Sequence, residues 1–115
     1  MQYLLSLYID ESGWGTMTPE QQQQGAAAYT AYTEALKSAG VHVGSNRLRP
    51  SSTATTLRIT NGKSQVLDGP FAESKEQLAG YYLIDVKDLD AAMLWAGRCP
   101  AAQHGVVEVR AIWSM

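Results

Sequence analysis

The amino-acid sequence predicts a single α+β domain, and three observations lead to that prediction. Apolar runs of strand length alternate with two segments that have the apolar spacing of helices. The hairpin signal Asn61-Gly62 lies between two strand-like segments. A length of 115 residues and a hydrophobic content of 45% suit one core that needs no metal or disulfide. We therefore expect one domain over residues 1–115.

The first strand is expected at residues 3–9, a β-prone apolar run that ends at polar Asp10. A loop follows, in which Trp14 stands between Gly13 and Gly15. We interpret Trp14 as an anchor that holds this loop against the surface, and a mobile flap is the alternative.

A long helix is expected over residues 19–39, because both of its ends carry local signals. Thr18 can cap the helix, Pro19 suits the first helical position, and Gln21 can close a capping box. Gly40 ends it. One apolar stripe follows from the spacing of Ala26, Tyr29, Tyr32 or Thr33, and Leu36.

The remaining elements follow from similar signals. Asn61-Gly62 favours a type I′ turn, so the segments on either side should pair as a hairpin. Asp88 caps a second helix that Pro100 ends. Further strands are expected at residues 41–44, 54–60, 63–67, 81–86 and 106–112. The order predicts a ferredoxin-like βαββαβ sandwich with an extra β-hairpin.

Two helices cover only one face of such a sheet. The uncovered face still carries aromatic and aliphatic residues, so we expect it to pack against a second copy of itself. The expected assembly is a homodimer of the dimeric α/β barrel type, with a cleft between the subunits.

Composition narrows the function classes. The net charge of -2 and pI of about 5.6 disfavour a nucleic-acid partner. Cys99 is the single cysteine, which fits a reducing compartment and a cytoplasmic location. No signal peptide or membrane-spanning run is expected. The common nucleotide, zinc and hydrolase motifs are missing, so we expect neither cofactor nor metal. With His42 and His104 as the only histidines, a metal site would need distant carboxylates.

The most function-like stretch is the turn Asp68-Gly69-Pro70-Phe71, directly after a predicted strand. A carboxylate held at a strand end can act as a base or orient an imidazole. The same residues are also ordinary turn chemistry, in which Asp68 bonds its own backbone. Both interpretations stay open, and the structural one is favoured from residue types alone.

Four further side chains are candidates. His104 precedes the last strand, and histidine titrates near neutrality, although such a residue is more often a backbone partner than a catalyst. Arg110 shares a strand face with Glu108, so it can bind an anionic ligand or pair with that carboxylate. Tyr8 and Tyr82 can line a pocket, or belong to the core.

Several segments together resemble the DGPF branch of the YCII-related family. They are Asp68-Gly69-Pro70-Phe71 with the run that follows to Leu78, then Gly80-Tyr81-Tyr82, and Val107-Glu108-Val109-Arg110. The resemblance implies a dimeric ferredoxin-like α+β fold. The wider YCII group is similar to small lyases and isomerases of aromatic breakdown, for which a histidine and aspartate pair is the proposed active site.

Asp68 matches the aspartate of that pair. The histidine of the wider group lies on the first helix, and residues 19–39 here contain none. His104 would be a substitute from another part of the chain. The DGPF branch is also associated with genes for extracytoplasmic-function sigma factors, which implies an accessory role and a transcription-related protein partner.

Two functional hypotheses follow, and a purely structural dimer is the remaining alternative. The first is a domain that binds a small anionic or aromatic ligand, as an accessory or regulatory module. The alternative is a cofactor-free lyase or isomerase that uses Asp68 and His104 in the dimer cleft, with Arg110, Tyr82 and Tyr8 holding the substrate.

Overall fold

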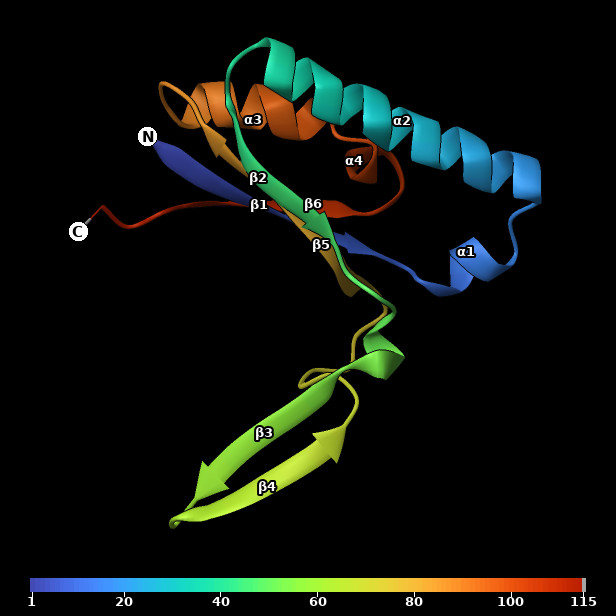
Figure 1. The fold of residues 1–115 in the computed structure, drawn as a ribbon, viewed down its shortest axis with the longest axis vertical. Helices are drawn as coiled ribbons and strands as arrows, with labels where there is room; N and C mark the ends of the chain where they lie inside the picture. Colours follow the sequence, from blue (N-terminus) through green and yellow to red (C-terminus); the bar gives the residue numbers. More distant parts are fainter. Residues whose placement is uncertain (115) are drawn as a thin grey trace.

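The computed structural model describes residues 1–114 and contains a four-stranded sheet, a layer of helices and a separate hairpin (Figure 1). The elements are β1 (Gln2–Ile9), α1 (Ser12–Gly15), α2 (Pro19–Ser38), β2 (His42–Arg47), η1 (Ser51–Thr53), β3 (Thr55–Thr60), β4 (Lys63–Asp68), β5 (Gln77–Asp85), α3 (Leu89–Arg98), α4 (Ala101–His104) and β6 (Val106–Ala111). The predicted order of strands and long helices is confirmed.

The main sheet has the strand order β2-β5-β1-β6, and every neighbouring pair is antiparallel. Without the inserted hairpin, β1, α2, β2, β5, α3 and β6 form a βαββαβ unit of the ferredoxin-like type. Both long helices lie on one side of the sheet (Figure 1). The predicted fold class, including the extra hairpin, is therefore confirmed.

The ends of α2 follow the predicted local chemistry. The Thr18 side chain accepts a hydrogen bond from the Gln21 backbone, and the Gln21 side chain accepts one from the Thr18 backbone. At the other end Gly40 has a φ of 74°, and its N–H donates to the carbonyl of Lys37. Val41 donates to the carbonyl of Leu36 in the same way. These are the two bonds of a Schellman cap, which needs a left-handed residue at Gly40.

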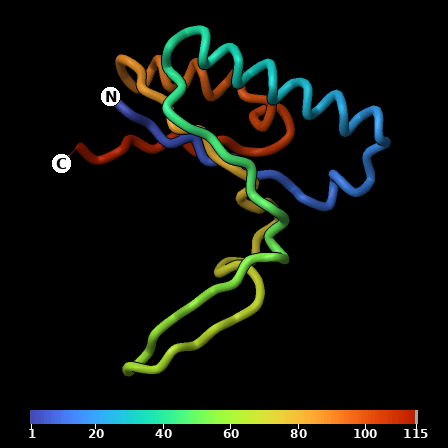
Figure 2. Tube along the Cα trace, in the orientation of Figure 1, coloured from blue at the N-terminus to red at the C-terminus, as the bar shows by residue number. Residues whose placement is uncertain are grey.

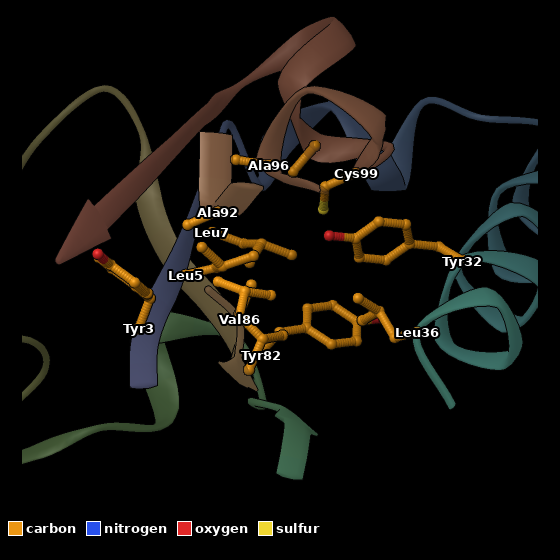
Figure 3. Close-up of a cluster of buried hydrophobic side chains, with 12 residues drawn as sticks. Tyr3, Leu5, Leu7, Tyr32, Leu36, Tyr82, Val86, Ala92, Ala96 and Cys99 are labelled. Carbon is orange, nitrogen blue, oxygen red and sulfur yellow. The ribbon is translucent and has the colours of Figure 1, made fainter. Parts of the chain in front are cut away.

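The core fills the space between the sheet and the two long helices (Figure 3). Leu5, Leu36 and Ile84 are fully buried within it. The Tyr32 ring packs edge-on against the Tyr82 ring, with centroids 5.1 Å apart. The Tyr32 hydroxyl donates to the carbonyl of Trp95 at 2.8 Å. That carbonyl lies in the last turn of α3, where helical carbonyls lack their usual partners, so Tyr32 ties α2 to α3.

The hairpin β3–β4 projects away from the body on the side of the sheet opposite the helices (Figure 2). Its turn has positive φ at both Asn61 and Gly62, as the predicted type I′ turn requires. All six residues of β4 are exposed. The chain is accordingly extended, with a radius of gyration of 16.1 Å, against about 13 Å for a compact chain of this length.

Three local predictions were wrong. Residues 12–15 form α1 instead of a loop, and residues 101–104 form α4, so His104 ends a helical turn. Neither turn has a side-chain cap, and the sequence therefore lacks the signal that reveals longer helices. Gln77 pairs with Ile9 as the first residue of β5, four residues before the predicted start of that strand.

Candidate functional site

A cleft of about 880 Å³ lies between α2 and the helix-facing side of the sheet. Its walls come from β1, α1, α2, β2, β5 and α4. The cleft exists because α2 is longer than the sheet beneath it, and its N-terminal half reaches outward past the strands (Figure 1). The buried residues of α2, Tyr32 and Leu36, both lie in its C-terminal half. The N-terminal half of α2 is therefore not part of the core and forms the upper wall of the cleft.

Most of the lining is apolar. Leu7 and Ile9 line it from β1, and Trp14 and Met17 line it from α1 and the segment that follows. The lining also includes the small α2 residues Gly25, Ala26 and Ala28, which occupy little of its space. Such a concave surface removes a flat apolar molecule from water.

Two hydroxyl groups meet in the wall of the cleft. The Thr33 Oγ1 lies 2.8 Å from the Tyr82 hydroxyl, and it donates to the carbonyl of Tyr29 at 2.9 Å. A threonine hydroxyl has one hydrogen, so Tyr82 is the donor toward Thr33. The Tyr82 oxygen therefore keeps acceptor capacity, and a hydroxyl of a bound molecule can donate to it.

Tyr29 brings a third hydroxyl to the cleft. Within residues 1–114 no protein group is bonded to it. Burial raises the pKa of the Tyr29 phenol to about 12, and burial is also the main reason why the pKa of Tyr82 is raised. Both phenols are therefore neutral at physiological pH and act as hydrogen-bonding groups.

The ionisable side chains that line the cleft are Asp10, Arg47 and His104. Asp10 accepts two hydrogen bonds from Ser12, which hold the pKa of its carboxyl below the usual range. The Arg47 guanidinium lies over the Trp14 ring at 5.0 Å from its centroid. Neither ion pair found in residues 1–114 involves Arg47, so its charge is available to an anionic group.

The five predicted site residues fall in three places. Tyr82 and His104 line the cleft together. Asp68 is the exposed last residue of β4, opposite Thr55 at the base of the hairpin, and does not line the cleft. Within one chain the structure therefore does not bring Asp68 and His104 into one pocket.

Tyr8 and Arg110 lie on the open face of the sheet, away from the helices. The side chains of a strand alternate between faces, and the neighbours Leu7 and Val109 pack toward the core. The Arg110 guanidinium donates to the Glu108 carboxylate at 2.6 Å. Of the two interpretations of Arg110, the structure shows the pairing with Glu108.

Tyr29, Thr33 and Arg47 line the cleft but were not among the candidates predicted from the sequence. Tyr29, and Thr33 as an alternative to Tyr32, were assigned to the apolar stripe of the helix, although each carries a hydroxyl on the inward face. A hydroxyl group at an inward-facing helix position is the sequence signal that could have identified Tyr29 and Thr33. Arg47 gave none, because its place at the cleft depends on the pairing of β2 with Gly80 of β5.

Two further features bear on the class of site. Within residues 1–114 there is no group of three or more histidine, cysteine, aspartate or glutamate side chains that could hold a metal ion. The described helices include none that is both long and apolar enough to cross a membrane.

The fold and the cleft define a ferredoxin-like α+β domain with a pocket on the helix side of its sheet. The chain belongs to the YCII-related domain family, whose model matches residues 1–115. It is 40% identical over 96 residues to an uncharacterized protein of Rhizobium meliloti, covering 84% of this chain and 77% of that protein.

Among solved structures, the chain is similar to 5-chloro-2-hydroxyhydroquinone dehydrochlorinase from Burkholderia phenoliruptrix, in complex with 2,5-dihydroxybenzoquinone. The TM-score is 0.55 with 15% sequence identity, and the match covers 99% of this chain and 94% of the other. At this identity the similarity shows the fold alone.

Proposed function

We propose that this YCII-related domain binds a small aromatic molecule in the cleft beneath α2. The observation that carries the proposal is the cleft itself, with a volume of about 880 Å³ and an apolar lining into which a few polar groups point. Pockets for small molecules have this size and this composition. Binding without turnover suits an accessory or regulatory module. In such a module, the bound ligand changes the interaction with a transcription-related protein partner.

The polar groups define the chemistry of the ligand. Tyr82 offers an acceptor to a ligand hydroxyl, because its own hydrogen is engaged by Thr33. Arg47 offers a positive charge near the aromatic Trp14. A ring that carries a hydroxyl group and an anionic oxygen matches both. The dehydrochlorinase of the same fold holds 2,5-dihydroxybenzoquinone, and we choose that compound as a probe alongside hydroxybenzoates.

A lyase or isomerase is a second candidate function, and the position of His104 favours it. His104 lines the same cleft as Tyr82, so an imidazole can exchange a proton with a molecule bound there. Asp68 of the same chain takes no part in this lyase or isomerase mechanism, because it lies outside the cleft. Turnover of a bound ring that is lost in His104→Gln, with binding retained, would favour this candidate over binding alone.

The test is a calorimetric or NMR titration of the purified chain with the probe compounds. The matched variants are Ala28→Leu, which fills the cleft from α2, and Ala27→Leu, which places the same side chain one residue earlier on an exposed position that does not line it. We expect Ala28→Leu to weaken binding at least about tenfold and Ala27→Leu to change it less than about twofold, because only the first fills the ligand's space. Equal affinities for both variants would refute the cleft as the site.

A further inference from the structure

The hairpin β3–β4 has one apolar face that nothing in residues 1–114 covers. Leu57 lies opposite Val66 in the hairpin register, and Ile59 follows two residues after Leu57 on the same face. Their exposed fractions are 61%, 61% and 65%. The opposite face carries the polar side chains of Arg58, Gln65 and Lys63, with Leu67 as its one large apolar side chain. The hairpin is therefore amphipathic, as a strand pair is when one of its faces is packed.

An isolated two-stranded hairpin is at best marginally stable in water. This one has no third strand, since β3 and β4 form a sheet of their own. It also exposes its largest side chains instead of burying them. A defined hairpin of this kind needs a surface to cover its apolar face.

The open face of the main sheet is a second uncovered surface, with apolar side chains beside the Arg110–Glu108 ion pair. Leu4 lies opposite Leu83, and Tyr8 lies opposite Val106. All four alternate with residues that pack toward the helices. The hairpin leaves the body on this side of the sheet (Figures 1 and 2). One chain thus displays a largely apolar sheet face and an amphipathic hairpin on the same side.

The amount of exposed surface matches a second copy of the chain. The accessible surface is 8236 Å², whereas a compact chain of 12.5 kDa is expected to expose about 6,200 Å². The excess of about 2,000 Å² is more than the roughly 800 Å² per partner that a standard stable interface buries. Two copies related by a two-fold axis would cover both surfaces at once, because each would present the surface that the other needs.

We propose that β3–β4 is an intersubunit arm. In a homodimer the open sheet faces meet, and the Leu57, Ile59 and Val66 face of each arm packs against the body of the other chain on that side. The arm fixes the pairing of the two chains and leaves the cleft beneath α2 on the outer, helix-covered side of each. This inference does not depend on the ligand proposed above.

Two leucines of the arm provide a matched test. Leu57 and Leu67 are exposed to 61% and 67%, and they lie on opposite faces of the same hairpin. Sedimentation velocity would be measured over a dilution series for the wild type, Leu57→Lys and Leu67→Lys. We expect the wild type to sediment as a dimer of twice the 12.5 kDa chain mass. Leu57→Lys should raise the dissociation constant at least about tenfold and Leu67→Lys less than about threefold. A monomeric wild type, or equal effects of the two substitutions, would overturn the proposal.

A second measurement locates the arm and does not rely on a weakened dimer. A spin label is attached through Lys63→Cys at the polar side of the tip, where Cys99 does not compete because its thiol is fully buried. The labelled chain is mixed with an isotope-labelled wild-type chain. We expect intermolecular line broadening at open-face residues of the second chain and not at α2 or α3. Broadening confined to the helices, or no intermolecular broadening, would contradict an arm on this side.

Discussion

The Tyr82 hydroxyl of β5 lies 2.8 Å from the Thr33 hydroxyl of α2, and both residues line the cleft. This contact joins the roof of the cleft to its floor. It also sets the direction of the hydrogen bond, because the single hydrogen of Thr33 is given to the carbonyl of Tyr29. One pair of side chains therefore holds the cleft together and leaves an acceptor for a ligand.

Thr33→Val tests this contact. The substitution keeps the shape of the side chain but leaves the largely buried Tyr82 without its partner. Thr30→Val is the matched control, since Thr30 makes the same bond to the carbonyl four residues earlier but is exposed. We expect Thr33→Val to lower the free energy of unfolding by about 1 kcal/mol more than Thr30→Val. Urea denaturation measures both, and equal losses would show that the Tyr82 contact contributes nothing.

Alkaline pH should destabilise the fold through Tyr29. Burial raises the pKa of its phenol from 10.0 to about 12, so between these values the unfolded chain releases a proton that the folded chain keeps. The contribution of Tyr29 to stability is thus complete below about pH 10 and is lost as the pH rises toward about 12. Urea midpoints at about pH 9 and about pH 11.5 measure the loss.

Tyr29→Phe is the variant for this test. Its stability at about pH 9 should be within about 0.5 kcal/mol of the wild type, because no protein hydrogen bond to the hydroxyl is lost. Its further loss of stability at high pH should be smaller than that of the wild type. An unchanged pH dependence would mean that the folded and unfolded chains ionise Tyr29 alike.

Gly80 in β5 should not tolerate a side chain. A Cβ at Gly80 would stand 2.6 Å from the backbone oxygen of Asn46 in β2, and a backbone atom cannot turn aside. Gly97 of α3 is the control, because a Cβ there meets nothing within 4 Å. We expect Gly80→Ala to cost about 1–3 kcal/mol and Gly97→Ala to be neutral or to stabilise the chain by up to about 1 kcal/mol. Thermal and urea unfolding give both values.

The fold could be predicted from the sequence because its signals are local. Thr18, Pro19 and Gln21 define the start of α2, and Asp88 caps α3 by accepting from Ala91, as expected. The Asn61-Gly62 turn specifies the hairpin within two residues. These interactions join neighbours in the chain, so residue type and spacing reveal them.

The site depends on long-range geometry and could be predicted only in part. Tyr82 and His104 lie in one cleft because β5 and α4 are both neighbours of β1 in space, which no local pattern shows. Tyr8 and Tyr82 were grouped by residue type, yet the alternation of their strands places them on opposite faces. Asp68 was singled out by its turn, and its distance from the cleft follows from the projection of the hairpin.

The central claim is that a small aromatic ligand binds beneath α2 and not on the open sheet face. Backbone amide shifts of the isotope-labelled chain, followed while 2,5-dihydroxybenzoquinone or a hydroxybenzoate is added, test it directly. We predict the largest shifts at Thr33, Ser45 and Gly80, which line the cleft, with little change at Leu4 and Arg110. Shifts centred on Leu4 and Arg110, or no shifts with any of these compounds, would contradict the claim.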